Sequence, residues 1–266
     1  GAGKAVIDAP ALLFATGGLQ PVDLSPLLVS LVNANGKVRF AGTLAWTHDG
    51  VTSNGLLTVD SLDFKTPLGV AHSVHSTIAL ASLLPPVTED GQHLDISRVD
   101  AVLPITGLEM TFAAGPGSIH IEATRTDIAS GSASLAPITI ELANTASSTG
   151  VVRLAKLDLA QIVAASNIGD QVKITGLVSG TVPFSFGPAG FRIADGHVEL
   201  AGPGRLEIDR TLWTKGAAVS SMQDLAYQAL EHLAVDSLSA NINSVAGGRL
   251  QIVFHIKGEN DPPKPE

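Results

Sequence analysis

The stretch RLQIVFHIKG, residues 249–258, alternates apolar and polar side chains with one interruption. Because successive side chains of a β-strand point to opposite faces, a period of two predicts a strand with one apolar face. The apolar set is Leu250, Ile252, Phe254 and Ile256, and the second set is Arg249, Gln251, Val253, His255 and Lys257. The fold must therefore place something against the apolar face, and the outer edge of this strand is open to strand pairing.

Further segments with the same period fill most of the chain. They are separated by Asp-Gly, Asn-Gly, Pro-Gly and Ser-rich turns, which favour hairpins. The clearest segments are residues 37–46, 56–65, 72–81, 118–127, 136–143 and 151–159. The sequence thus predicts a mainly β, largely antiparallel fold with many meandering strands.

Two hairpins can be assigned a register. In residues 190–200, a two-residue turn that starts at Asp195 would pair Ile193 with Val198 on an apolar face, and a bulge at Asp195 is the alternative. In the final hairpin, residues 237–257, any even sum of paired residue numbers keeps both apolar sets on one face.

Two short amphipathic helices are expected. Residues 220–237 carry Ser221 and Asp224 at capping-box spacing, followed by an apolar stripe. Residues 158–167 predict a shorter helix with three apolar residues turned inward.

The chain contains a weak internal repeat. Residues 23–44 resemble residues 157–178, and each copy reads as a short helix, a turn and a strand with a glycine. Chance similarity among strands rich in Leu, Val and Gly is the alternative. We expect one continuous β segment over residues 1–257, in two related halves of about 1–150 and 151–257, followed by a disordered tail at 258–266.

Composition narrows the function. The net charge is −9 and no basic run occurs, which argues against a nucleic-acid partner. Cysteine is absent, so disulfides and thiol chemistry are excluded, and no apolar run approaches the ~18 residues of a membrane span. Because the chain starts at Gly1 without Met, we expect it to be a piece of a longer protein.

No motif for catalysis or metal binding is present in the sequence. None of the eight histidines forms an HExxH pair, and no P-loop, G-x-G-x-x-G or G-x-S-x-G motif occurs. His72 and His75 are three apart in an expected strand, which predicts opposite faces and no shared metal. We therefore expect no catalytic residue, metal or cofactor; a hydrolase with a dispersed site is a remote alternative.

The apolar face of the second half is the remaining candidate site. Its expected members are Val172, Ile174, Val178, Val182, Phe184, Phe186, Phe191, Ile193, Val198, Leu200, Leu206, Ile208, Ile242, Leu250, Ile252, Phe254 and Ile256. The pattern alone favours a closed sandwich or barrel in which two such faces bury each other. The alternative is a curved, open sheet whose concave side holds acyl chains, which need aliphatic lining and no hydrogen bonds.

Two stretches near the end of the chain carry an ordered series of motifs: KITGLVSGTVPFSFGPAGFRIADGHVELAGPGRLEI (173–208) and MQDLAYQALEHLAVDSLSANINSVAGGRLQIVFHIKGEN (222–260). The series consists of a G-x-[LV]-x-G-x-x-P-[LF] strand, a D-G hairpin, a P-G turn, an A-L-E helix leading into D-S-L, and a final strand. In these motifs the last hundred residues resemble the YdbH family, a group of AsmA-like, bridge-like lipid-transfer proteins. The family ends in N-P, whereas this chain has Asn260-Asp261-Pro262. Residues 1–150 resemble it only in general strand character.

The resemblance implies an elongated, curved, largely antiparallel β-sheet that forms a U-shaped apolar groove. It implies the C-terminal part of a bridge that carries phospholipids across the periplasm of a Gram-negative bacterium, with an inner-membrane anchor outside this chain. The site residues above would line the groove against phospholipid acyl chains. The second set of 249–257 would mark the edge where a small YnbE-like outer-membrane lipoprotein adds a strand. The alternatives are a structural or protein-binding β module and dicarboxylate transport.

Overall fold

The computed structural model describes residues 1–24, 28–29, 31–66, 69–142, 147–188, 190–209, 232–245 and 249–261. Within these ranges the chain forms 18 strands and two short helices. The strand pairs with an assigned register are antiparallel, from β1–β2 to β17–β18. The prediction of a mainly β, antiparallel fold is confirmed, and the short helix expected within residues 158–167 is present as α2 (Leu159–Ala164).

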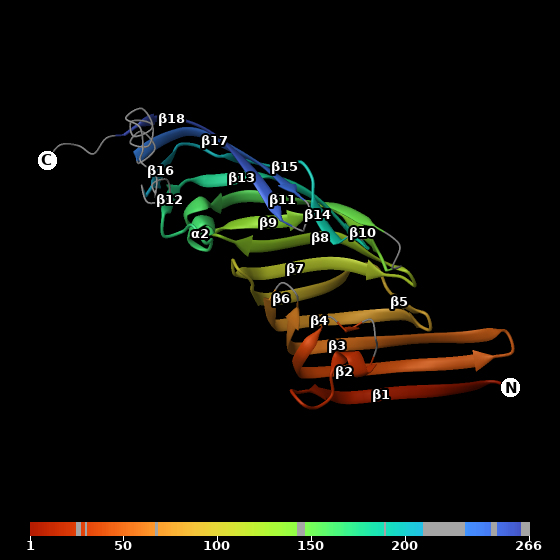
Figure 1. The fold of residues 1–266 in the computed structure, drawn as a ribbon. Coiled ribbons are helices and arrows are strands. Elements are labelled where there is room, and N and C mark those ends of the chain that lie inside the picture. Colours follow the sequence, from red (N-terminus) through yellow and green to blue (C-terminus); the bar gives the residue numbers. More distant parts are fainter. Residues whose placement is uncertain are drawn as a thin grey trace. The chain divides into compact units, whose positions relative to one another are not determined.

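The chain divides into two compact units. The first comprises Gly1–Asp127, Ser134–Gly150 and Phe186–Ala189. It holds α1 (Pro21–Leu24), β1 (Gly3–Phe14), β2 (Val32–Thr47), β3 (Gly50–Thr66), β4 (Gly69–Leu83), β5 (Pro86–Thr88), β6 (Gln92–Asp100), β7 (Ile105–Ala114), most of β8 (Ser118–Ile128) and β10 (Ile138–Glu141). Strands β1, β2, β3, β4, β6 and β7 follow one another as antiparallel neighbours (Figure 1).

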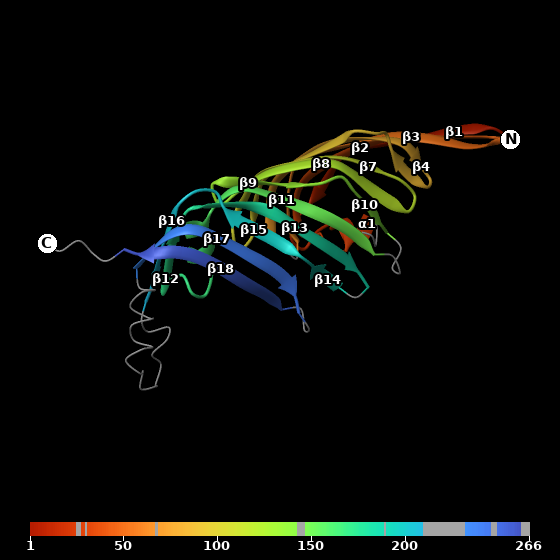
Figure 2. The same cartoon turned by 90° about the horizontal axis from the view of Figure 1, so that it is seen from above.

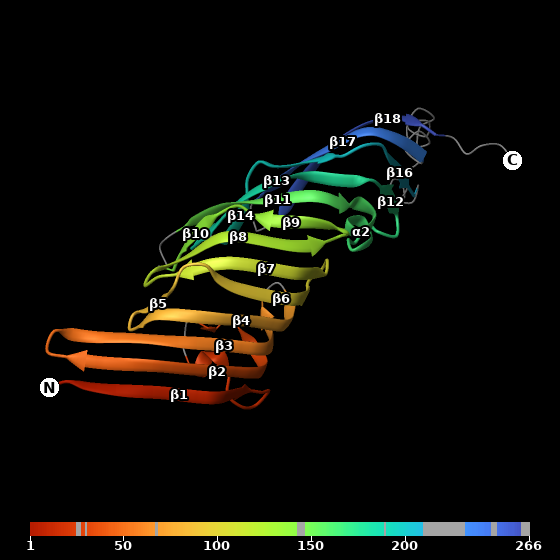
Figure 3. The ribbon, with the colours of Figure 1, turned by 180° about the vertical axis from the view of Figure 1, so that it is seen from behind.

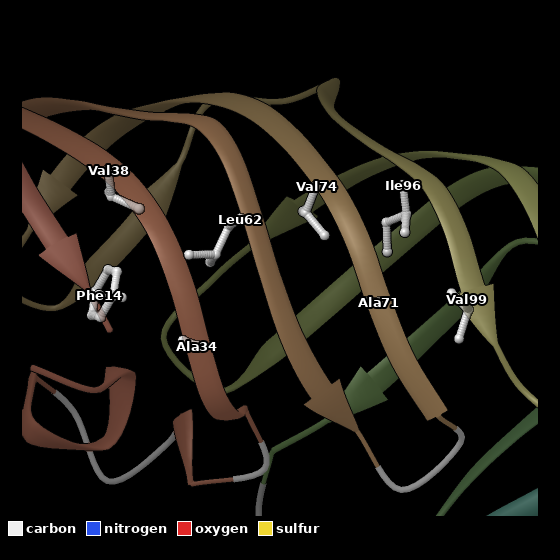
Figure 4. Close-up of a cluster of buried hydrophobic side chains, with 8 residues drawn as sticks. All are labelled: Phe14, Ala34, Val38, Leu62, Ala71, Val74, Ile96 and Val99. Atoms are coloured by element: carbon white, nitrogen blue, oxygen red, sulfur yellow. The ribbon is translucent and has the colours of Figure 1, made fainter. Parts of the chain in front are cut away.

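Aliphatic side chains cover one face of this first sheet. Figure 4 shows Val38, Leu62, Val74 and Ile96 on the same side of β2, β3, β4 and β6. Every member of the buried cluster and of the partly buried set around it comes from β1–β4, β6 and β7, except Leu19 of the connection after β1. In the described part of this unit, the apolar face therefore packs beneath a short connection, and the closed sandwich is not formed there.

The second unit comprises Ile128–Ala133, Val151–Ser185 and Gly190–Glu266. It holds part of β9 (Gly131–Leu135), most of β11 (Ser148–Asp158), α2 (Leu159–Ala164), β12 (Val172–Thr175), most of β13 (Leu177–Gly187), β14 (Gly190–Ile193), β15 (Gly196–Leu200), β16 (Gly204–Ile208), β17 (His232–Ser244) and β18 (Leu250–Asn260).

The strands of the second unit form a meander. β12 and β13 are one strand broken at Gly176, whose φ is +131°, and they pair with β16 and β15 respectively. β17 then pairs with both β15 and β16, and β18 pairs with β17. Helix α2 lies beside β12 at one end of these strands (Figure 3). Its N-cap is Asp158, whose carboxylate accepts a hydrogen bond from the Ala160 N–H at 2.9 Å.

The predicted hairpin within residues 190–200 is wrong. Val198 pairs with Gly180 on one side and with Ala240 on the other, so it cannot also pair with Ile193 as predicted. Instead β14 and β15 run in succession along the sheet, and Asp195 between them has a φ of +57°. The bulge at Asp195, the alternative interpretation, agrees with this conformation.

The final hairpin has the predicted parity. From the pair Ser237–Lys257 onward, residue numbers of paired residues have an even sum, as for Leu238 with Ile256 and Ala240 with Phe254. Beyond a bulge after Val235, residues 233–235 pair with 258–260 and the sum is odd. The expected helix at 220–237 lies outside the described residues up to 231, and its last six residues, 232–237, belong to β17. β18 continues to Asn260, so the strand is longer than expected.

The two expected halves stay a prediction. The repeat correctly placed α2 and the strand after it, and α1 precedes β2 in the first copy. Residues 25–27 of the first copy, where its short helix is expected, lie outside the described residues.

Candidate functional site

The apolar face of the second unit crosses four strands in register. Gly180 of β13, Val198 of β15, Ala240 of β17 and Phe254 of β18 lie in one cross-strand row. Side chains two positions away along each strand share this face. The structure therefore brings residues of β13, β15, β17 and β18 from the predicted site together on one surface.

One part of this surface is buried beneath α2. Val178 and Leu206 are 2% and 4% exposed and form a cluster with Leu238 and with Leu159 of the helix. The predicted site residues in this cluster or packed against it are Val172, Ile174, Val178, Leu200, Leu206 and Ile208. We call these six residues the covered set. Val198 is also buried, but it does not belong to this cluster.

The other part of the surface is open to solvent. Phe191, Leu250 and Phe254 are 58%, 54% and 57% exposed, and Ile252 and Ile256 are exposed as well. We call these five residues the exposed set. Large apolar side chains this accessible in a continuous row point to a binding surface. The remaining predicted site residues, Val182, Phe184, Phe186, Ile193 and Ile242, are half-buried.

Two aromatic rings connect the exposed set to β13. The rings of Phe184 and Phe191 stack with centroids 5.6 Å apart and planes inclined by 23°. Such stacking fixes both rings on the apolar side of the sheet. This end of the surface is therefore aromatic, whereas the covered end is aliphatic.

The second set of residues predicted in 249–257 lies on the opposite face of β18. Gln251, Val253, His255 and Lys257 stand opposite Asn243, Asn241, Ser239 and Ser237 of β17. Arg249 precedes the strand and its carbonyl accepts a hydrogen bond from the Val245 N–H. Lys257 of β18 thus faces the neutral Ser237 of β17, and every residue of β18 is exposed. The strand follows β17 at the outer side of the second unit (Figure 2).

The first unit carries a comparable apolar surface that the site prediction did not include. Trp46 of β2 lies over Gly3 of β1, and Phe40 covers the paired glycines Gly42 and Gly55. Trp46 and Val51 are exposed at the adjoining ends of β2 and β3, and Ile7 is exposed within β1. The alternation of KVRFAGTLAW, residues 37–46, was the available signal, because it gives this strand an apolar face.

The polar side of the first unit contains a charge cluster. The His72 ring lies between two carboxylates, with Nδ1 3.3 Å from Asp63 and Nε2 3.1 Å from Asp100. Hydrogen bonds to Asp63 first and to Asp100 second raise the pKa of His72. Arg98 above all, and then His72, lower the pKa of Asp100. The cluster joins β3, β4 and β6 on the face opposite to the apolar one.

The expectation that His72 and His75 point to opposite faces is wrong. Ser73 has a φ of +52°, and this residue interrupts the alternation. Ala71 and Val74 are consequently both in the buried cluster, which turns His72 and His75 to the same polar side. In the described ranges, no group of three His, Cys, Asp or Glu side chains is arranged to hold a metal ion.

The described part of the chain contains no helix with the length and apolar character needed to cross a membrane.

Comparison with known proteins bears on the whole chain. The YdbH-like family model, described as intermembrane phospholipid transport protein YdbH, matches residues 1–264. The match covers residues 1–150 too, where only general strand character was expected. The predicted resemblance is confirmed. No curated protein and no solved structure matches the chain.

Proposed function

Because the chain belongs to the YdbH-like family, we propose that it is the C-terminal part of a periplasm-spanning bridge that conducts phospholipids between the inner and outer membranes. The acyl chains lie in a hydrophobic β-groove, and motion along it is passive. No residue is catalytic, and the chain needs no cofactor. The inner-membrane anchor lies outside this chain.

The observation that carries this proposal is the exposed apolar row of β18. Leu250, Ile252, Phe254 and Ile256 are between 38% and 57% exposed, although they face the apolar side of the sheet. Exposure of this much apolar surface is unfavourable in water and is relieved by contact with hydrocarbon. An acyl chain fits such a surface because it has no polar group that needs a hydrogen bond.

The edge of β18 is the proposed partner site. A small outer-membrane lipoprotein of the YnbE type adds a strand there and extends the apolar face by one row. Backbone N–H and C=O groups of the two strands form the pairing. Specificity comes from the partner's side chains that lie opposite Arg249, His255 and Lys257. Full exposure of β18 supports this role.

A structural or protein-binding module is the competing function, and dicarboxylate transport ranks lower. A dicarboxylate requires cations, whereas the predicted lining is wholly apolar. Displacement of a fluorescent fatty acid from the purified protein by phospholipid separates the first two functions. Failure of the fatty acid to bind favours the protein-binding module.

The direct test is lipid analysis of the purified protein together with a transport assay. Native mass spectrometry is expected to detect bound phospholipid. Phe254→Asp and Ile193→Asp are expected to impair transport, because a charge on the apolar face must be desolvated when hydrocarbon covers it. Arg192→Ala, next to Ile193 in sequence, is the control and is expected to leave transport unchanged. Equal transport by all three variants would refute the proposal.

A further inference from the structure

Coverage of the apolar face changes across the second unit, from its inner strands to its outer strand. On the inner strands the buried cluster includes Leu159 of α2, and Ile162 and Val163 of the helix pack against this cluster. On the outer part, Phe191 and Leu250 are more than half exposed, and Ile256, paired with the buried Leu238, is 38% exposed. The face is therefore divided into a packed part and an accessible part.

The first unit shows the same division independently. Leu19 packs against its buried cluster, and Gln20 fixes the connection to β2. The Gln20 carboxamide accepts from the Ala34 N–H at 2.8 Å and donates to the Ala34 carbonyl at 3.2 Å. At the opposite ends of these strands, Trp46 and Val51 are exposed. A short covering segment over one part of an apolar face thus occurs in both units.

Packing decides which part of the face can touch a ligand. Protein interiors are close-packed, so side chains such as Val178 and Leu238, at 2% and 3% exposure, have no room for an acyl chain beside them. Lifting α2 would uncover aliphatic surface on both the helix and the sheet, which is unfavourable in water. The covering helix and its capping bond to Asp158 make this part of the face a fixed part of the core.

We propose that α2 is a side wall of the lipid path and that acyl chains run only over the exposed set and its half-buried neighbours. The covered set then has a structural role, although it shares the face and the alternation of the lining residues. This inference rests on the proposed function and limits the number of apolar residues that contact lipid. It assigns Phe191, Leu250, Ile252, Phe254 and Ile256 to lipid contact and Ile174, Val178 and Leu206 to the core.

Photo-leucine provides a nearly isosteric probe of this division. The full-length protein is produced with photo-leucine in place of leucine, mixed with vesicles of phosphatidylethanolamine and phosphatidylglycerol, and irradiated. Mass spectrometry then locates lipid adducts by peptide. Adducts are expected at Leu250 and absent at Leu206 and Leu238. Leu177 is the control, because it is 41% exposed but lies next to Val178 on the opposite face of β13.

The outcomes separate the wall from the function itself. Adducts at Leu206 and Leu238 as frequent as those at Leu250 would overturn the wall and leave lipid binding intact. Labelling of Leu177 equal to that of Leu250, or no adduct at any leucine, would overturn the proposed function and the wall with it.

A second variant tests whether α2 is the cause of the exclusion. Ile162→Ala combined with Val163→Ala shortens the side chains that the helix sets against the sheet. Adducts at Leu206 are expected to appear in this variant if it remains folded by circular dichroism. An unchanged adduct pattern in the folded variant would show that something other than these side chains excludes the lipid.

Discussion

Gly180 allows a close backbone approach within the apolar face. A Cβ atom there would lie 2.1 Å from the His197 carbonyl oxygen and 2.6 Å from the Val198 Cα. Because both obstacles are backbone atoms of the paired strand β15, the sheet itself would have to move. Gly180→Ala is expected to lower the free energy of unfolding by about 1–3 kcal/mol, measured by urea denaturation.

Gly117→Ala is the matched control for this substitution. No heavy atom lies within 4 Å of a Cβ built at Gly117, so the change is expected to be close to neutral. Equal destabilisation by both variants would contradict the proposed steric cause.

His72 makes stability depend on pH. Its pKa is raised from 6.5 by Asp63 and Asp100, so its contribution is fully present below pH 6.5 and is lost as the pH rises through the raised value. The pKa of Asp100 is lowered from 3.8, so its contribution is present above pH 3.8 and is lost as the pH falls through the lowered value. Both contributions act together at mildly acidic pH.

His72→Gln is therefore expected to lower the melting temperature at about pH 5 more than at about pH 9. His48→Gln, in the exposed turn between β2 and β3, is the control, and its melting temperature is measured at the same two pH values. A melting-temperature difference for His72→Gln that stays constant between the two pH values would rule out the ionic contribution.

At the scale of elements, α2 depends on its first residues. The helix has only six residues, and Asp158 satisfies the Ala160 N–H at its start. Asp158→Ala is expected to lower the free energy of unfolding by about 0.5–2 kcal/mol, whereas Asp158→Asn, which can still accept this hydrogen bond, should retain most of the stability. Equal losses in thermal or urea unfolding would argue against capping as the mechanism.

Elements also show what the sequence could predict. The final hairpin was predictable because apolar residues occupy every second position of both strands, so any even register places Ala240 and Phe254 on one face. Residues 190–200 were not predictable, since their local pattern suits a hairpin, whereas in the structure they pair with β13, which precedes them, and with the more distant β17. At Ser73 a single left-handed residue changed the side of His75, and serine gives no warning of that conformation.

At the scale of the whole molecule, alternation predicted which residues share a face but not which of them are covered. Val178 and Phe254 have the same pattern in sequence, yet one is buried beneath α2 and the other is exposed. Coverage depends on where a separate segment packs, and periodicity carries no information about that. The family match over residues 1–264 includes the residues of the first unit as well.

Lipid contact in the first unit can be measured through Trp46, which is 40% exposed. The chain has two tryptophans, and Trp213→Phe leaves Trp46 as the remaining one. Phospholipid with brominated acyl chains is expected to quench its fluorescence, because bromine quenches an indole ring only at close contact. The same lipid without bromine is the control. Identical emission with both lipids would restrict lipid binding to the second unit.

The mixed character of β18 has a consequence for handling the protein. The apolar row of Leu250, Ile252, Phe254 and Ile256 lies between Arg249 and Lys257 along this edge. The like charges of these two residues repel another copy of the same strand. We expect these two cations to oppose self-association through pairing of β18 with a second copy of β18. A partner strand that carries carboxylates at the facing positions would still pair with this edge. Neutralising both with glutamine should bring turbidity at lower protein concentration, an outcome that light scattering would register.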